Sequence, residues 1–367
     1  MIPVNRPLIS NEDIQAVIET LKSDLVSGDT SVIRDCEETI GQILGVNNVV
    51  LVNSGTSAID IAVESLGIEA GDECVMPSFT IMSTVNQLLR KNAKIRLIDS
   101  DPINWSLNLD EAESAISEST KLVVPVHIYG FPSNLVRLTE KSKQLGFQIL
   151  EDAAESFGSR FNNKALGTFG TVGIYSFYAN KVVTGGEGGA IVSDDSVLAS
   201  KARKYRNLNF SSERFVHDGL GWNARMNSLS AALIRSQIRR LDEILRLKRR
   251  IGERYRDGLK DHPWFIHPSD SNYGSLNAYW VYGVILNSDT KLDARELQIL
   301  LEEKFQIQTR RFFCPIHLQP FIHKYNLHFD DLKVSEWLWN RGIYLPSGLG
   351  NTFQEIDYVM ETLWGLV

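Results

Sequence analysis

Short apolar runs alternate with longer amphipathic stretches through the first 200 residues of the chain. The apolar runs cover residues 48–52, 74–76, 94–98, 121–126 and 147–150. Most of them are nearly continuous in apolar residues, which is typical of strands buried on both faces of a parallel sheet. The stretches between them have helical spacing, and we expect helices at 58–66, 79–89, 109–116 and 135–145. The pattern predicts an α/β fold with a mostly parallel sheet between helices.

Two further helices are expected before the first strand. Ser10 followed by Asp13 has the spacing of a capping box, which predicts a helix from there to Leu21. A second helix should begin near Val32 and end at Gly45, where a left-handed residue would terminate it.

The pattern changes after a long amphipathic stretch at 226–259, which predicts one helix or two helices with a kink. A strand-like run at 278–286, a helix at 294–303, a strand near 307–310 and helices on either side of 344–346 follow. We therefore expect a large cofactor-binding domain at 1–245, in which 1–14 form an N-terminal segment. A smaller C-terminal α/β domain should cover 246–367.

Net charge, apolar run length and cysteine spacing exclude several classes of binding partner. The 367 residues carry a formal net charge of −7, which argues against nucleic acid and against an anionic membrane surface. No apolar run reaches membrane-spanning length, and the N-terminus lacks the apolar core of a signal peptide. The cysteines Cys36, Cys74 and Cys314 have no metal-ligand spacing, so we expect no metal site and a reducing cytoplasm.

Polar residues follow several of the expected strands. Residues 54–57, Ser78, His127 and Asp152 all lie just beyond a strand end. Ligands of parallel sheets bind beyond the carboxyl ends of the strands, so these groups could meet in one crevice. The turn at 54–57 also opens a helix, whose N-terminus can bind a phosphate, although an ordinary helix cap has the same appearance.

A glycine-rich turn contains the most informative lysine. Apolar runs at 172–178 and 190–193 enclose Lys181 and four glycines at positions 185, 186, 188 and 189. Glycine allows positive φ angles and close approach of the backbone to a bound group. A lysine desolvated in such a turn has a lowered pKa and can serve as an amine nucleophile. A solvated loop lysine is the ordinary alternative.

Asp152 strengthens the functional interpretation of Lys181. A carboxylate at the end of a buried strand needs a positive charge or hydrogen bonds. Pyridoxal 5'-phosphate uses both groups, because it requires a lysine for attachment, a carboxylate at its ring nitrogen and donors for its phosphate. Taken alone, a carboxylate such as Asp152 at a strand end is more often structural.

Six stretches of the chain resemble a known family. They are Asn53 to Ala58, Gly71 to Thr80, Val126 to Gly130, Glu151 to Glu155, Ser176 to Gly189 and Pro315 to Pro320. Together they resemble the DegT-type sugar-nucleotide aminotransferases, which are fold type I enzymes dependent on pyridoxal phosphate. The resemblance covers nearly the whole chain. It implies an aspartate-aminotransferase-like fold and a homodimer with shared active sites.

The resemblance also implies roles for individual residues. Lys181 would attach the cofactor and Asp152 would meet its ring nitrogen. The phosphate would be held by Gly55, Thr56 and Ser176.

Other implied roles concern the surroundings of the cofactor ring and the substrate. Phe79 would stack on the ring, with core packing as its alternative, and Glu155 would lie near the ring hydroxyl. Asn223 would reach the phosphate of the partner subunit's cofactor. The substrate region would include His127, Arg225 and His317, each of which could equally be a structural polar group.

The C-terminal stretch at 309–317 most resembles enzymes that aminate C4 of GDP-4-keto-6-deoxymannose to give GDP-perosamine. The implied function is this transfer from L-glutamate, for surface polysaccharide (O-antigen) biosynthesis. Alternatives are a dTDP- or UDP-linked keto sugar, a 3-keto sugar, and a non-catalytic sensor with the same fold. In the related sugar dehydratases a histidine replaces the attachment lysine, so Lys181 argues against that chemistry.

Overall fold

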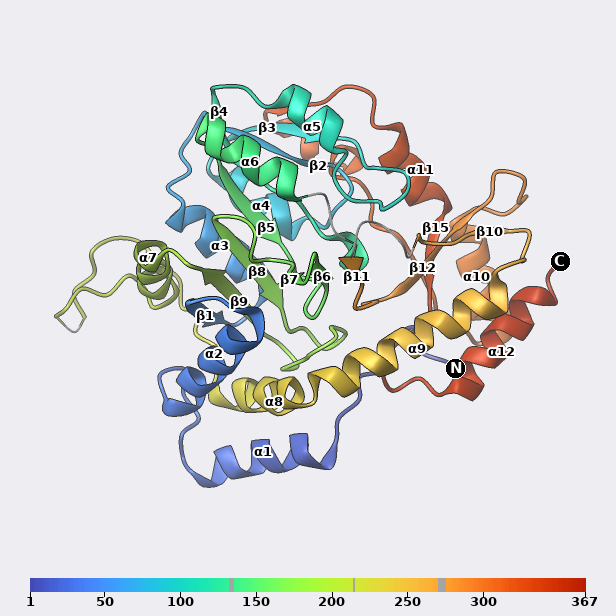
Figure 1. Ribbon diagram of the computed structural model, residues 1–367, viewed down its shortest axis with the longest axis horizontal. Helices are drawn as coiled ribbons and strands as arrows, with labels where there is room; N and C mark the ends of the chain where they lie inside the picture. The colour runs from blue at the N-terminus through green and yellow to red at the C-terminus, as the bar shows by residue number, and fades with distance from the viewer. Residues whose placement is uncertain (132–134, 214, 270–274) are drawn as a thin grey trace.

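The computed structural model describes residues 1–131, 135–213, 215–269 and 275–367 (Figure 1). Its helices are α1 (Asn11–Lys22), α2 (Ser31–Leu44), α3 (Gly55–Ser65), α4 (Ser83–Arg90), α5 (Leu109–Ala115), α6 (Leu135–Leu145), α7 (Ser196–Arg206), α8 (Ser228–Arg239), α9 (Leu241–Leu259), α10 (Ala294–Phe305), α11 (Lys333–Arg341) and α12 (Phe353–Trp364). Among the described residues, no helix is both long and apolar enough to cross a membrane.

The strands form three sheets. They are β1 (Asn48–Val52), β2 (Glu73–Pro77), β3 (Lys94–Ile98), β4 (Thr120–Val123), β5 (Gln148–Asp152), β6 (Arg160–Phe161), β7 (Lys164–Ala165), β8 (Val172–Ser176), β9 (Gly189–Ser193), β10 (Phe265–Ile266), β11 (Ser275–Leu276), β12 (Tyr282–Leu286), β13 (Arg310–Arg311), β14 (Leu327–His328) and β15 (Gly342–Leu345). The large sheet has the order β1-β9-β8-β5-β4-β2-β3-β14, and two small sheets have the orders β10-β12-β15-β13 and β11-β6-β7.

The large sheet is mostly parallel, as the apolar runs predict. Neighbours from β8 through β5, β4, β2 and β3 to β14 are parallel, whereas β9 is antiparallel to both β8 and β1. Because β9 returns beside β8, the glycine-rich turn that joins them lies at the same sheet edge as the start of α3. The α/β fold is confirmed.

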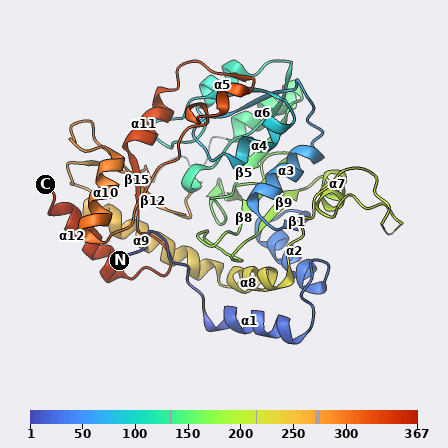
Figure 2. The same cartoon turned by 180° about the vertical axis from the view of Figure 1, so that it is seen from behind.

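Helices cover both faces of this sheet, which explains the uninterrupted apolar strands. In β1, Val50 and Val52 join the core formed with α3, α4 and α7, while Val49 and Leu51 join the core formed with α2 and α8. Helices α5 and α6 cover the second face further along, against Val75 and Ile149. Helices lie on both sides of the large sheet in Figures 1 and 2, so side chains of β1 alternate between two cores.

The four-stranded sheet has a core of its own. It packs with α9, α10 and α12 around residues such as Tyr255, Val284 and Leu301. Helix α9 leads from the large sheet to this smaller unit (Figure 1). The proposed domain boundary at residue 245 falls within α9. Strand β14 nevertheless pairs with β3, so part of the C-terminal region completes the large sheet.

The expected helix caps are present, whereas several expected element boundaries differ from those in the structure. The capping box of Ser10 and Asp13 is formed, and Gly45 ends α2 with φ of 73°. The stretch at 226–259 is two helices separated at Arg240. The helix expected from 79 starts only at Ser83, and the strand expected near 307–310 is the two-residue β13. These shifts leave irregular segments near the sheet edge.

A buried carboxylate attaches α11 to the large sheet. Asp99 follows β3, and its carboxylate accepts hydrogen bonds from Val334 N at 2.8 Å, Ser335 N at 2.7 Å and Ser335 Oγ at 2.6 Å. These donors belong to the first turn of α11, where backbone N–H groups have no partner within the helix. Asp99 therefore links the smaller C-terminal unit to the sheet edge.

Substituting Asp99→Asn should destabilise the protein by about 1.5–3 kcal/mol, because an amide cannot accept from all of these donors and loses the charge. Thermal and urea unfolding followed by circular dichroism measure the change. Asp110→Asn is the matched control, since Asp110 pairs with Arg137 while 84% exposed. Equal effects of the two substitutions would contradict the role given to Asp99.

Candidate active site

The amine of Lys181 lies among side chains from three separate segments. Its Nζ is 3.8 Å from Oε1 of Glu155 and 3.7 Å from the ring centroid of Trp280. The Lys181 side chain is only 12% exposed. Lys181 and Glu155 lie just beyond β8 and β5, and Trp280 precedes β12. The Lys181 side chain is thus largely shielded from water by Glu155 and Trp280.

Glycines allow the turn after Lys181 to fold tightly. The backbone N–H of Lys181 donates to Tyr178 O at 2.9 Å, and that of Gly185 donates to Phe177 O at 2.9 Å. Gly186 and Gly188 have φ of 78° and 152°, values that favour glycine. A Cβ on Gly188 would also lie 2.7 Å from Cε of Met226. The four glycines therefore shape the turn that carries Lys181.

Burial and charge act in opposite directions on the amine. Desolvation lowers the pKa of Lys181, while the carboxylates of Glu155 and Asp152 raise it. Burial in turn raises the pKa of Glu155 to about 7, against the influence of Lys181. The backbone N–H of Tyr129 donates to Oε2 of Glu155 at 2.8 Å and fixes this carboxylate. Tyr129 itself has φ of 54°, which is strained for a tyrosine.

Asp152 ends β5 and is 3% exposed. Thr84 Oγ1 donates to its Oδ2 at 2.7 Å, and Ala154 N donates to its Oδ1 at 3.1 Å. Burial raises the pKa of Asp152, because the charged form loses water. A protonated ring nitrogen would supply the positive charge that this carboxylate needs, so the site fits pyridoxal phosphate here.

The three residues expected around a phosphate meet at the N-terminus of α3. Ser54 caps this helix by accepting from Ser57 N at 3.0 Å. A Cβ on Gly55 would lie 2.9 Å from Cβ of Ser176, so glycine permits the close approach of α3 and β8. Thr56 Oγ1 lies 2.9 Å from Ser83 Oγ at the start of α4. An anion at this helix N-terminus would meet backbone N–H groups and hydroxyls, which fits the cofactor's phosphate.

Phe79 lies inside the protein. It is 0% exposed, and its ring packs at 6.4 Å from Tyr129, 6.0 Å from Phe312 and 6.2 Å from Phe313. These contacts support the core-packing alternative, and stacking on a cofactor ring stays a prediction. The apolar side chain of Ile81, two residues further on, is 48% exposed.

Two histidines expected near the substrate have protein partners. His127 Nε2 lies 3.0 Å from Glu151 Oε2, and both side chains are fully buried. His317 Nδ1 lies 2.7 Å from Ser78 Oγ, and its Nε2 lies 3.2 Å from Glu336 Oε1. These contacts support the structural alternative for His127, and a substrate role for either histidine stays a prediction.

Asn223 and Arg225 lie on the return of a loop that projects from the body between α7 and α8 (Figures 1 and 2). Asn223 is exposed, and its backbone pairs with Asn207, whose Oδ1 accepts from the guanidinium of Arg225. Within the described ranges, no side-chain hydrogen bond joins Asn223 to the groups around Lys181. The backbone of Arg225 bridges to Val52 at the end of β1, so this return segment lies beside the residues that lead into α3.

Residues 7–364 match the DegT/DnrJ/EryC1/StrS aminotransferase family. The chain belongs to this family. Proteins named GDP-perosamine synthase are 30% identical in Escherichia coli O157:H7, covering 99% of this chain and 97% of the relative, and 32% identical in Vibrio cholerae, covering 95% of each. The aminotransferase TlmJ from Streptoalloteichus hindustanus has a similar structure, with a TM-score of 0.92 at 28% identity, covering 100% of this chain and 99% of the other.

Family membership makes the chain an aminotransferase that depends on pyridoxal phosphate. Two residues of its site were not identified from the sequence. Thr84 donates to Asp152 from α4, and Trp280 faces Lys181 from the smaller C-terminal unit. Thr84 lies six residues after Ser78, one of the polar residues at a strand end, so its sequence position gave some indication. No motif in the sequence around Trp280 indicates a role in the site.

Replacing Glu155 with glutamine should lower the pKa of Lys181, because the nearest opposite charge is removed. Above pH 7 Glu155 is ionised and favours the ammonium form, so its loss makes Lys181 neutral at lower pH. Trace acetylation of the full chain at a series of pH values, read by peptide mass spectrometry, measures the midpoint for Lys181. Glutamine keeps the acceptor for Tyr129 N–H, so the geometry is preserved.

Glu187→Gln is the matched control, because Glu187 is exposed in the same glycine-rich turn. It should leave the Lys181 midpoint unchanged. A midpoint that does not move, or that rises, in Glu155→Gln would show that the 3.8 Å contact does not govern the amine.

Proposed function

We propose that this aminotransferase moves an amino group from L-glutamate onto C4 of a nucleotide-linked 4-keto-6-deoxysugar, with GDP-4-keto-6-deoxymannose as the first candidate. The buried amine of Lys181 beside the buried carboxylates of Asp152 and Glu155 carries the proposal. The relatives named GDP-perosamine synthase support the choice of sugar, and they match this chain over 95–99% of its length. The product would serve surface polysaccharide (O-antigen) synthesis in the cytoplasm.

The residues of the chain have distinct tasks in this proposal. Pyridoxal phosphate, when bound, accepts the electrons of a substrate Cα–H bond into its ring. Asp152 would hold the proton on the ring nitrogen, and Lys181 would attach the cofactor and, in its neutral form, could carry a proton. The lowered pKa of Lys181 suits this task, because it increases the neutral fraction of the amine.

The remaining residues bind and orient. Backbone N–H groups of Gly55 and Thr56, with the hydroxyl of Ser176, would hold the phosphate at the N-terminus of α3. The N–H of Tyr129 fixes the Glu155 carboxylate, which would lie near the ring hydroxyl of the cofactor. A dTDP- or UDP-linked keto sugar would use the same machinery and differ in contacts beyond it.

A panel of nucleotide-linked keto sugars tests the proposal. The purified protein is incubated with L-glutamate and GDP-, dTDP- or UDP-linked 4-keto-6-deoxysugars, and products are identified by mass spectrometry. We expect an amino sugar from the GDP-linked compound at the highest kcat/KM. Lys181→Ala should retain the cofactor and lose turnover by several orders of magnitude, because attachment and proton transfer both depend on the amine.

Turnover close to wild type in Lys181→Ala would reject the catalytic assignment. Preference for a dTDP- or UDP-linked sugar would reject the GDP assignment and leave the aminotransferase chemistry standing. Glu187→Gln serves as the control for changes within the same turn.

We also propose a homodimer in which each site takes Lys181 from one subunit and Asn223 from the other. The exposed position of Asn223, whose backbone bridges to Asn207 at the base of the projecting loop, supports this arrangement. Exposed apolar residues on the same loop support it too, since Leu220 is 94% exposed.

Subunit mixing tests the shared site. Lys181→Ala chains are exchanged with Asn223→Glu chains, whose added carboxylate repels the phosphate. About half of the dimers become mixed, and one site in each then carries neither substitution, so activity should rise to about a quarter of wild type. Exchange is verified by native mass spectrometry. No recovery after complete exchange would show that both residues of a site come from one subunit.

A further inference from the structure

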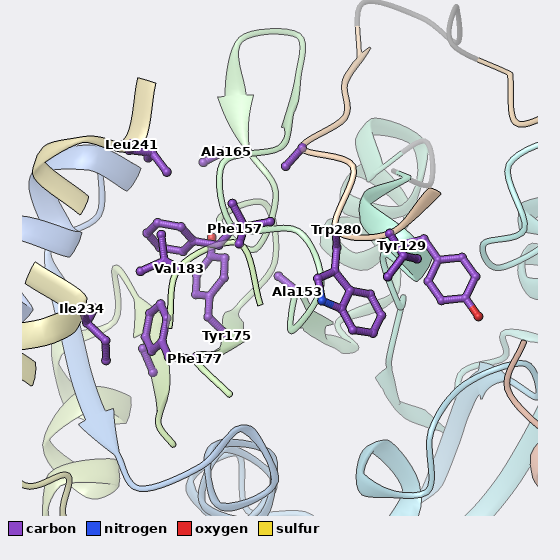
Figure 3. Packing of buried hydrophobic residues seen from close by; sticks show 14 of the residues in the cluster. Tyr129, Ala153, Phe157, Ala165, Tyr175, Phe177, Val183, Ile234, Leu241 and Trp280 are labelled. Carbon is purple, nitrogen blue, oxygen red and sulfur yellow. The ribbon is translucent and has the colours of Figure 1, made fainter. Parts of the chain in front are cut away.

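Trp280 contacts Lys181 in two ways. The centroid of its ring lies 3.7 Å from Lys181 Nζ, and its indole N–H donates at 2.8 Å to the carbonyl of Asn180, the residue before Lys181. The Trp280 side chain is 4% exposed and packs at 5.9 Å from the ring of Tyr129 (Figure 3). One side chain from the smaller C-terminal unit therefore touches both the backbone carbonyl of Asn180 and the amine of Lys181.

The carbonyl of Trp280 is held by a second buried lysine. Lys248 of α9 is 2% exposed, and its Nζ donates to Trp280 O at 3.0 Å and to Ser347 O. In the described part of the chain Lys248 forms no ion pair, and burial lowers its pKa to about 7. Burying a lysine without a carboxylate partner costs free energy. Lysines are rarely buried in this way, so Lys248 is expected to have a role beyond packing.

Lys248 connects three parts of the fold through these two carbonyls. Trp280 lies just before β12, Ser347 lies just after β15, and Lys248 lies on the helix that joins the large sheet to the smaller unit. The hydroxyl of Ser347 also accepts from Tyr282 N at 3.0 Å. The segment bearing Trp280 is thus fixed from α9 and β15 while its ring faces the large-sheet turn.

We propose that Trp280 is a positioning residue for the amine of Lys181, and that Lys248 acts through Trp280 by holding its backbone. The ring face and Glu155 together define where the amine rests when it is not attached to cofactor. This inference rests on the proposed function in one respect, which is that Lys181 has a chemical task in catalysis. The smaller unit thereby takes part in the lysine's reactivity.

The direction of the effect follows from the groups that face the amine. The carboxylates of Glu155 and Asp152 and the negative face of the Trp280 ring all favour the ammonium form, while burial disfavours it. Removing the ring while keeping the site apolar takes away one favourable contact. The pKa of Lys181 should then fall.

Trace acetylation of the full chain without added cofactor measures this directly. The rate of labelling at Lys181 follows its neutral fraction, and exposed Lys22 provides an internal reference in the same digest. In Trp280→Leu the midpoint for Lys181 should shift down by roughly 0.5–1 pH unit. Trp280→Phe, which keeps a ring face, should shift it less.

Trp364→Leu is the matched control. Trp364 also donates its indole N–H to a backbone carbonyl, that of Gly258 at 2.9 Å, but lies on α12. It should leave the Lys181 midpoint in place. An unchanged or raised midpoint in Trp280→Leu would overturn the positioning role, and so would an equal shift in the control.

A double-mutant cycle tests the part given to Lys248. Lys248→Met should move the Lys181 midpoint in the same direction as Trp280→Leu, and adding it to Trp280→Leu should move the midpoint no further. Lys248→Gln replaces it if the methionine variant does not fold, with the same expectations. If Lys248→Met lowers thermal stability without shifting the Lys181 midpoint, Lys248 is only structural and its part of the proposal is rejected. Additive midpoint shifts in the double variant would also reject it, because Lys248 would then not act through Trp280.

Failure here is distinguishable from failure of the proposed function. The acetylation midpoint requires neither cofactor nor substrate. A wild-type protein that does not aminate any sugar rejects the function, whereas unchanged midpoints in the Trp280 and Lys248 variants reject only the positioning roles.

Discussion

An amine removed from water beside two buried carboxylates is the arrangement on which this protein depends. Lys181, Glu155 and Asp152 each lose hydration, and each would be costly to bury alone. Lys181 lowers the cost of burying each carboxylate, whereas the two carboxylates repel each other, and the pKa of the amine stays below its ordinary value. Groups with such balanced charges are easily moved between protonation states, and proton transfer requires that property.

The parallel sheet supplies the geometry for this cluster. Strands β5 and β8 are parallel neighbours, so Asp152 and the turn after Ser176 emerge at one edge. The antiparallel return of β9 places that turn beside β1 and the N-terminus of α3. If β9 were parallel to β8, a crossover connection would have to join the two strands in place of the short glycine-rich turn. The close approach of Gly55 to Ser176 would then not form as it does here.

The smaller C-terminal unit is more than a cover for this edge. Trp280, in the segment before β12, contacts the amine of Lys181 beside the large sheet. Asp99, just after a strand of the large sheet, binds the first turn of α11 in the smaller unit. These contacts join the two units through buried polar groups. Buried polar contacts tolerate little displacement, which suits a site whose parts come from both units.

The amino-acid sequence alone determined the class of fold and the chemistry of the site. Uniformly apolar strands require helices on both faces, and the glycines around Lys181 with a carboxylate at the end of β5 indicate a cofactor-binding lysine. Such signals are local, so they can be recognised from neighbouring residues. Only the tertiary structure decided that Phe79 is buried, that Thr84 binds Asp152, and that Trp280 faces Lys181 across about a hundred residues. Contacts between distant segments leave no periodic signal, because they depend on how the sheets and helices pack.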